Sequence, residues 1–485
     1  MWAFSSVGSR GRRWESLVGL VASASLLAAG AADAGVAGGA GAALPPAHRC
    51  PARPGIELEE GRPLGPGTSA RLARLLPAEL QEHAETLFGP RGATPLGSCY
   101  RRYPIPWFYR EATRRHAGRA HVDGEGNLHG YVAGLPFPVS TLASDDPRAA
   151  ARWAWNLAAR YRGAGPAGRF RIVDVNDQGR DRRRYAGHFF FLRTAHRADR
   201  RRPGDASSRR AHARWLFAAG GRFESPFSAR HLAWRQLRPL AVETDSGVED
   251  DIFVYAPSMR RPERSATAWV DGLFVPRYTV SGSFGDGQSA GPGGIHLGLH
   301  RASAVREDIR RGLTGLALRP NAYDWAWLET RDVLAPLNAA GVCRGEGGAE
   351  RTASQALGLE GAAWDLRRAV VLEGVARRAG RRVPRLTLYV DLQTQQPLFH
   401  VARAANGKPT EVGVLVHRYS GDVEGYPRWP DGSEARVFDP VASVHFRLGP
   451  SGASWRRESC EVVSVPPSPR ERALMLSVSA LTRGR

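Results

Sequence analysis

One serine has a spacing that nucleophilic enzymes use. Gly287-Gln-Ser-Ala-Gly291 matches the G-x-S-x-G pattern, in which a strand delivers the serine onto a tight turn and a helix follows at once. Here glycines and serines precede the motif and Pro292 follows it, so neither flank has the pattern of a strand or a helix. We therefore interpret the match as chance in a glycine-rich loop. A secreted serine hydrolase that uses Ser289 remains the alternative function.

Two further patterns could hold a metal ion. His296 and His300 are four residues apart, but no glutamate stands beside them as in H-E-x-x-H, and glycines surround them. The segment that starts at Asp174 begins like a calcium loop, but Tyr185 occupies the position where a bidentate glutamate is required. The sequence therefore predicts no metal site and no cofactor.

A cluster of acidic residues precedes a basic stretch. Its members are Glu243, Asp245, Glu249, Asp250 and Asp251. Such carboxylates could hold a cation or act as acid and base, but a solvated acidic loop that pairs with Arg260 and Arg261 is the simpler interpretation. We predict no catalytic residue.

The formal net charge is +21, and Lys408 is the single lysine, so almost all of the positive charge is arginine. This excess has two interpretations: a compositional bias that also favours Ala, Gly and Pro, or a polyanionic partner. Arg260, Arg261 and Arg264 are candidates for binding anionic lipid headgroups through bidentate contacts, the alternative being a solvated surface. Nucleic acid is not a predicted partner, because no binding module is recognised and the chain has an export signal.

The N-terminus has the features of a secretory signal peptide. Arginines 10, 12 and 13 precede an apolar stretch of small residues and leucines, and Ala32-Asp-Ala34 fits a cleavage site. We predict a signal peptide over 1–34, a Gly/Ala/Pro-rich linker or arm over 35–66, and a single large domain over 67–485 with N- and C-terminal helical additions. The expected location is the periplasm, in solution or associated with the outer membrane. Four cysteines follow the cleavage site, and they allow two disulfides in three pairings: Cys50, Cys99, Cys343 and Cys460.

The elements that must position these residues are mostly strands. Helices are predicted around 68–89, over 145–163, over 299–318 and after Ser468, while 99–110 is expected to be extended. Short apolar runs predict an antiparallel sheet: 169–175, 188–193, 213–218, 231–242, 252–255, 268–275, 369–374, 386–391, 398–402, 412–419 and 443–448. In this reading, the stretch 251–275 is a strand, a basic turn and a second strand. Asn406-Gly407 predicts a hairpin with a type I′ turn.

A series of short motifs occurs in an order that resembles a known family. They are Gly134-Leu-Pro-Phe-Pro138, Trp155-Asn156, Arg160-Tyr-Arg-Gly163, Val254-Tyr-Ala-Pro-Ser-Met-Arg-Arg261, Tyr323-Asp-Trp325, Trp364 to Glu373 and Leu388-Tyr-Val-Asp391. The series spans roughly residues 95–420 and resembles an uncharacterised family of exported Gram-negative proteins, a domain of unknown function with a fold similar to the LolA/LolB lipoprotein carriers.

The resemblance implies a mainly β (α+β) fold, a large curved antiparallel sheet or half-open β-barrel around helices. It also implies an apolar concave face that holds a lipid or other lipophilic molecule, and a link to exporters of the resistance-nodulation-division (RND) type and to outer-membrane proteins. No catalytic residue is established for the family. On this basis we predict a non-enzymatic protein of an export or outer-membrane lipid pathway, the second alternative being a structural envelope partner of an exporter. The candidates for the ligand cavity are aromatic: Trp107, Phe108, Trp153, Trp155, Tyr255, Trp269, Phe274, Trp325 and Trp327.

Overall fold

The computed structural model describes residues 44–52, 58–64, 69–88, 94–175, 181–199, 214–255, 257, 260–265, 318–339, 359, 362–378, 383–429, 431–449, 452–464 and 466–482. All of these residues belong to one compact unit, Gly39–Arg485. The predicted signal peptide and the predicted strand at 268–275 lie outside the described residues, as do Ser289 and the histidines at 296 and 300. The domain boundaries therefore stay a prediction.

Fourteen strands of the described residues form one large sheet, in the order β1-β11-β12-β13-β14-β15-β16-β4-β5-β6-β7-β8-β9, with β10 paired to β11. Every pairing is antiparallel except that of β1 with β11. Seven strands of this sheet come from residues 167–335: β4 Ala167–Val175, β5 Asp181–Arg193, β6 Trp215–Ser225, β7 Ala233–Pro239, β8 Asp251–Tyr255, β9 Pro262–Ser265 and β10 Tyr323–Ala335. The others are β1 Leu96–Cys99, β11 Trp364–Ala376, β12 Arg385–Asp391, β13 Pro397–Arg403, β14 Pro409–Tyr419, β15 Phe438–Gly449 and β16 Gly452–Val463. A separate hairpin joins β2 His121–Val122 to β3 Leu128–His129.

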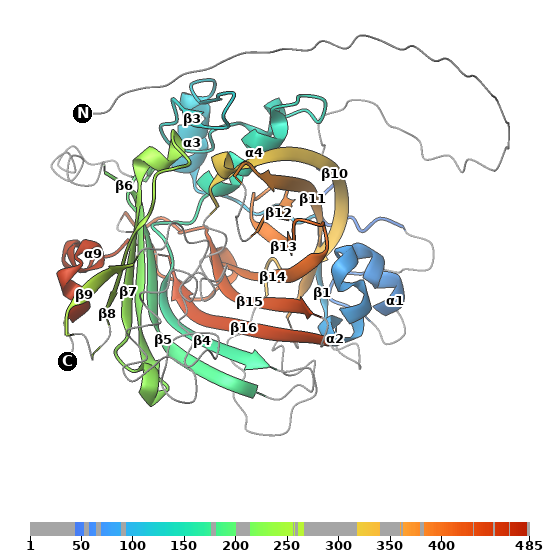
Figure 1. Ribbon diagram of the computed structural model, residues 1–485. Coiled ribbons are helices and arrows are strands. Elements are labelled where there is room, and N and C mark those ends of the chain that lie inside the picture. Colours follow the sequence, from blue (N-terminus) through green and yellow to red (C-terminus); the bar gives the residue numbers. More distant parts are fainter. Residues whose placement is uncertain are drawn as a thin grey trace, which may run out of the picture. The chain divides into compact units, whose positions relative to one another are not determined.

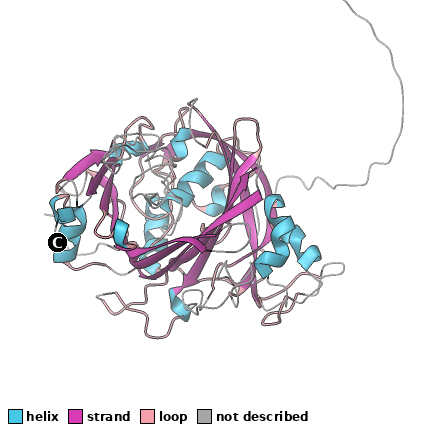
Figure 2. Cartoon of the chain, turned by 60° about the horizontal axis from the view of Figure 1, so that its bottom comes forward, coloured by secondary structure: helices cyan, strands magenta, loops and turns pink. Residues whose placement is uncertain are grey.

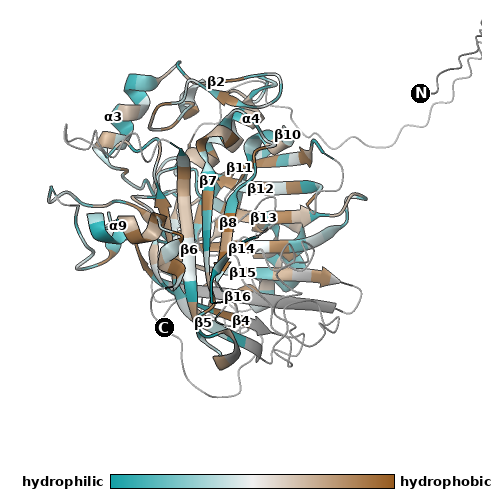
Figure 3. Ribbon diagram, turned by 60° about the vertical axis from the view of Figure 1, so that its left-hand side comes forward, coloured by the Kyte–Doolittle hydropathy of each residue, from teal (hydrophilic) through white to brown (hydrophobic). Residues whose placement is uncertain are grey.

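The sheet is curved, with the strands drawn green in Figure 1 turning away from the orange and red ones. Many residues of its strands are β-branched or aromatic, as the apolar runs predict. Hydrophobic residues, brown in Figure 3, recur across neighbouring strands from β11 to β15. This confirms the predicted mainly β fold with a large curved antiparallel sheet.

The α-helices of the described residues are few and short. They are α1 Ser69–Leu72, α2 Ala84–Phe88, α3 Trp107–His116, α4 Ala149–Ala159 and α9 Pro469–Leu476. Ser468 caps α9 in a reciprocal arrangement with Glu471, as the Ser-Pro sequence predicts. Among the residues that the structure describes, no helix is long and apolar enough to span a bilayer.

Helix α4 packs on one face of the sheet, and Figure 2 shows helices inside the curve of the strands. Its Trp153, Ala154 and Leu157 are fully buried in a cluster with residues of β11 to β14 such as Leu388 and Leu415. Complete burial of a large apolar side chain such as Trp153 or Leu157 stabilises the folded state by about 2 kcal/mol. The helix is thereby fixed to the sheet, and its last turn is held in place beside strand β5.

Two local expectations were wrong. Residues 99–110 are not extended throughout, because helix α3 begins at Trp107, directly after Pro106. Proline fixes φ near the helical value and lacks an amide hydrogen, so a helix begins after it at little cost. In the stretch 251–275, the partner of β8 already begins at Pro262, so the basic residue Arg264 lies in strand β9 rather than in a turn.

The hairpin predicted around Asn406-Gly407 is confirmed, since β13 and β14 pair on either side of it. The predicted type I′ turn was wrong. Gly407 has φ of +79°, but Asn406 does not have a positive φ, and the Gly407 amide donates to the Ala404 carbonyl, so the turn lies one residue earlier and the left-handed glycine follows it. Cys50 and Cys99 form a disulfide. This bond, with hydrogen bonds from His48 and Leu64 to the backbone of residues 94–99, ties the described part of the N-terminal arm to β1. Cys343 lies outside the described residues.

Candidate binding cavity

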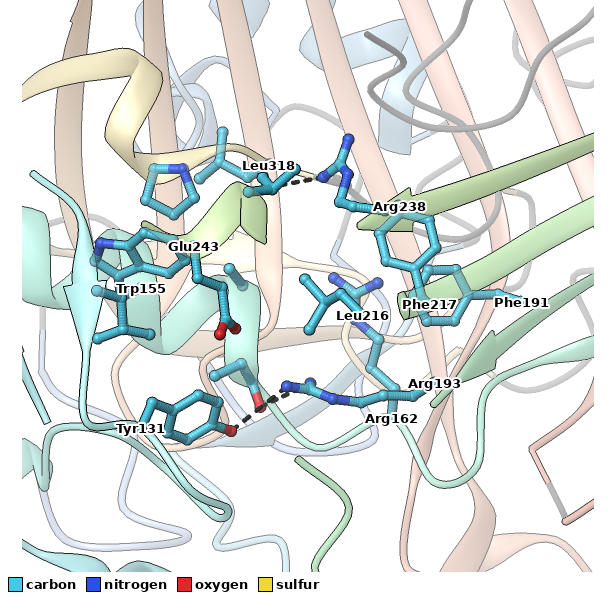
Figure 4. A pocket seen from close by; sticks show the side chains of 15 residues that line it. Tyr131, Trp155, Arg162, Phe191, Arg193, Leu216, Phe217, Arg238, Glu243 and Leu318 are labelled. Carbon is cyan, nitrogen blue, oxygen red and sulfur yellow. Dashed lines mark hydrogen bonds between the residues drawn. The ribbon is translucent and has the colours of Figure 1, made fainter. Parts of the chain in front are cut away.

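A cavity lies between the end of α4 and strands β5 to β7. Its empty volume is about 590 Å³, including open solvent at its mouth. Figure 4 shows the side chains that line it.

Most of the wall is apolar. The apolar lining residues are Leu128, Trp155, Ala158, Ala159, Phe191, Leu216, Phe217, Val242, Leu318 and Pro320. The Trp155 indole is fixed by donating a hydrogen bond to the Gly126 carbonyl, 2.9 Å away, and the alanines one turn later on α4 leave space beside it. A hydrocarbon group is therefore the ligand that fits most of this surface.

Two aromatic rings in the cavity wall each pack against the guanidinium group of an arginine. Phe191 and Phe217 pack with their ring centroids 4.6 Å apart. The Arg162 guanidinium lies 5.1 Å from the Phe191 ring centroid, and that of Arg238 lies 4.9 Å from the Phe217 ring centroid. Both distances are within reach of a cation–π interaction, so the wall places positive charge directly against apolar surface.

Arg238 is held by a buried carboxylate. Its Nη2 donates to Asp250 at 3.0 Å, and Arg319 and Gln236 each donate to the same carboxylate at 2.7 Å. Burial alone would raise the pKa of Asp250, but the two arginines outweigh it and hold the pKa below its ordinary value. Asp250 is thus a structural anchor with two cations around it, not part of a solvated acidic loop as its sequence context suggested.

A second polar group lies beside Tyr131. Arg193 donates to the Ala159 carbonyl at 3.2 Å and to the Tyr131 hydroxyl at 3.4 Å. Glu243 is bound instead by His196, with 2.9 Å between Nε2 and Oε2, and the His196 ring packs on Tyr131. The lining residues that keep solvent exposure are Tyr131, Ala158, Arg193 and Leu216, so the cavity opens on this side.

The cavity is electrostatically positive. Three arginines and one glutamate line it, a formal excess of two positive charges among the described lining residues. Burial, followed by the nearby Arg160, Arg193 and Arg238, lowers the pKa of Arg162 well below its ordinary value. Burial and Arg193 likewise lower the pKa of Arg160 to about 9. Since a lowered pKa means that the charged form is disfavoured, an anion at this end of the cavity would relieve the repulsion.

The aromatic residues predicted for a cavity lie in several places. Trp155 lines the cavity, while Trp153 is fully buried and packs edge-on against Trp327 of β10. Phe108 packs with Trp429 in a separate cluster. The remaining positions are as follows: Trp107 is 46% exposed, Tyr255 is buried near Leu481, Trp325 is partly buried on β10, and Trp269 and Phe274 lie outside the described residues.

The predicted headgroup arginines lie away from this cavity's lining. Arg260 and Arg261 are exposed, and Arg264 forms an ion pair with Asp251 across β8 and β9. Asp251 therefore pairs with Arg264. Whether any of the three binds an anionic group stays a prediction.

The polar residues of the cavity were not predicted, although their sequence contains a signal. Arg193 ends the run Phe189-Phe-Phe-Leu, and Arg238 follows Leu237 in a strand. An arginine at the end of an apolar strand is rarely buried unless it has partners. Arg162 lies in a motif that was recognised. The direction of its side chain into the cavity depends on the path of the backbone after α4, where Gly163 has a left-handed φ of +61°.

Comparison with known proteins finds similar solved structures and one matching family. No curated protein matches the sequence. Solved structures similar to it include a putative outer membrane lipoprotein-sorting protein domain from Vibrio parahaemolyticus, at 11% identity, a TM-score of 0.36, and coverage of 68% of this chain and 97% of that one. A DUF1329 family protein from Desulfovibrio piger is similar at 10% identity and a TM-score of 0.36, covering 66% and 93%. A LolA superfamily protein from Nitrosomonas europaea is similar at 13% identity and a TM-score of 0.31, covering 65% and 92%.

The sequence also matches one protein family. The match confirms the resemblance predicted from the motifs: residues 79–276 match the family described as "Protein of unknown function (DUF1329)".

Proposed function

We propose that this protein is a non-enzymatic carrier that binds an amphiphile with a hydrocarbon tail and an anionic headgroup in the cavity beside α4. The observation that carries the proposal is the composition of the cavity wall, in which an apolar surface ends at Arg162, Arg193 and Arg238. A fatty acid carboxylate or a lipid phosphate has this combination of groups.

The separation of apolar from charged residues in the cavity wall suggests how such a ligand is oriented. The alkyl chain packs against Trp155, Leu318 and the Phe191–Phe217 pair, where each buried methylene group contributes about 0.8 kcal/mol. The headgroup lies toward Arg193, which is half-buried at the open side. Such an orientation requires the tail to enter first, and the charged head to remain within reach of solvent.

The proposal extends to the cellular setting. The chain is exported by its predicted signal peptide, acts in the periplasm, and takes part in an export or outer-membrane lipid pathway with an exporter of the RND type as a partner. The support for export is the sequence pattern of residues 1–34, in which arginines precede an apolar stretch and a cleavage site. Crosslinking in intact cells followed by mass spectrometry of the adducts tests the partner separately from the ligand.

Ligand extraction tests the binding function. The mature protein, purified without detergent, is analysed by native mass spectrometry and its organic extract by lipid mass spectrometry. The stripped protein is then titrated with a fluorescent fatty acid. We expect a bound amphiphile and one saturable site. A protein that is empty and does not bind the probe would refute the proposal.

Two variants on α4 make the test specific to the cavity. Ala158→Phe fills the open side of the cavity and should weaken probe binding at least about tenfold, since overpacking there costs about 1–3 kcal/mol. Ala151→Phe is the matched control, because Ala151 is also half-buried on α4 but does not line the cavity. Equal loss of binding in both variants would show that the probe binds elsewhere.

A further inference from the structure

Three potential metal ligands meet on the sheet face that carries α4. His400 of β13, Glu411 of β14 and His445 of β15 have their ligand atoms within 4.8 Å of one another. Glu411 Oε1 lies 3.4 Å from His400 Nε2 and 3.6 Å from His445 Nδ1. Ligands at the usual zinc bond lengths, about 2.0–2.1 Å, are about 3.4 Å apart in a tetrahedron, so these separations already match a coordination sphere.

The register of the sheet explains how the two imidazoles meet. His400 is opposite Gly413 on β14, and Gly413 is opposite His445 on β15. The histidines are therefore two strands apart, about 9–10 Å between backbones, yet their ring centroids are 5.4 Å apart. They can converge because position 413 has no side chain: a Cβ there would be 1.9 Å from Cε1 of His400.

The hydrogen bonds of His445 orient one ring nitrogen toward the cluster. Its Nε2 is 3.0 Å from the Ser443 hydroxyl. Its Nδ1 has no hydrogen-bond partner among the residues that the structure describes, and the side chain is only 1% exposed. Metal-binding histidines usually have this pattern, in which one nitrogen is fixed by a hydrogen bond and the other faces the ion.

We propose that His400, Glu411 and His445 form a binding site for a divalent transition metal ion that links strands β13, β14 and β15. Two imidazoles and one carboxylate suit Zn²⁺ and its neighbours in the first transition row better than Mg²⁺ or Ca²⁺, which prefer oxygen ligands. Glu411 is the most exposed of the three, with 13% of its side chain accessible, so an ion enters from its side and a water molecule completes the sphere there. The site is independent of the amphiphile cavity.

Zinc titration of the mature protein tests the proposal. The protein is stripped with EDTA, and Zn²⁺ is added in competition with a chromophoric chelator. We expect one equivalent to bind tightly and to raise the melting temperature. Glu411→Gln and His445→Gln should each weaken binding at least about tenfold and abolish the zinc-dependent rise in melting temperature.

His188→Gln is the matched control, because His188 forms an exposed pair with Glu224, 2.8 Å apart, on a different strand. It should bind zinc like the wild type. If His445→Gln fails to fold, the nearly isosteric Glu411→Gln decides the outcome. Absence of stoichiometric binding to the wild type, or unchanged binding to Glu411→Gln, would overturn the proposal.

Discussion

The charge of the cavity gives a prediction whose sign separates an anionic ligand from a neutral or cationic one. Arg193→Met removes the half-buried guanidinium at the open side but keeps much of its apolar length. A hydrogen bond to a charged group contributes about 1.5–3 kcal/mol, so the affinity for a fatty acid should fall roughly 10- to 150-fold. The affinity for the fatty alcohol of equal chain length should change little.

Glu243→Gln should act in the opposite direction. This carboxylate lines the same cavity, and its like charge repels an anionic headgroup. At a separation of about 7 Å and an effective dielectric constant near 20, that repulsion is about 2 kcal/mol, so the acid should bind roughly 30-fold more tightly to the variant. The substitution preserves the size of the side chain while removing the negative partner of His196.

Displacement of a fluorescent probe by matched acids and alcohols measures both effects. The ratio of acid to alcohol affinity is the quantity to compare, because it cancels changes in folding or in the apolar wall. Arg193 also donates to the Ala159 carbonyl, so urea unfolding of each variant accompanies the titrations. If Arg193→Met leaves the ratio unchanged, or if Glu243→Gln lowers it, the headgroup is not an anion at this place.

Three further predictions concern stability. Replacing Cys50 and Cys99 by serine should lower the free energy of unfolding by about 4 kcal/mol, as expected for opening a loop of 49 residues, and urea unfolding with and without reductant checks it. Gly413→Ala should cost about 1–3 kcal/mol, measured by calorimetry, because its Cβ would displace the His400 ring; an unchanged melting temperature would contradict the close approach. Burial, followed by Arg160 and Arg162, lowers the pKa of His417 to about 3, so the native state stays neutral while the unfolded chain takes up a proton below pH about 6.5. The wild type should therefore lose about 2 kcal/mol more than His417→Gln between pH about 6.5 and about 4.5, and parallel stability curves for the two proteins would refute this assignment.

The parts of the fold that were predictable are those fixed by local sequence. Short apolar runs predicted ten of the fourteen described strands of the large sheet, whereas β1, β9, β10 and β16 were missed. Asn406-Gly407 predicted the hairpin of β13 and β14, because tight turns depend on adjacent residues. The start of α3 was missed, since the aromatic residues after Pro106 favour a strand by propensity while the proline favours a helix start.

The polar residues of both sites could not be predicted in the same way. Arg162 and Arg238 are 76 residues apart in the numbering, and His400 meets His445 only because Gly413 lies between them in the register of three strands. Sequence spacing of metal ligands is informative on a helix or in a short loop, as for His296 and His300. It is uninformative across a sheet, where the register determines which residues are neighbours.

Only a few of the many arginines bear on what the cavity binds. Several arginines are buried and bound to internal acceptors: Arg367 donates to Asp391 at 2.8 Å, and Arg238 and Arg319 share Asp250. Such residues stabilise the interior, and they contribute to the net charge of +21 without forming a surface for a polyanion. Arg193 differs because it is half-buried at the open side of an apolar cavity and donates to two carbonyls and a hydroxyl rather than to a carboxylate. A charge that keeps solvent access and neutral partners can still take up an anion, and for this reason the headgroup is expected at Arg193 and not wherever arginine is most abundant.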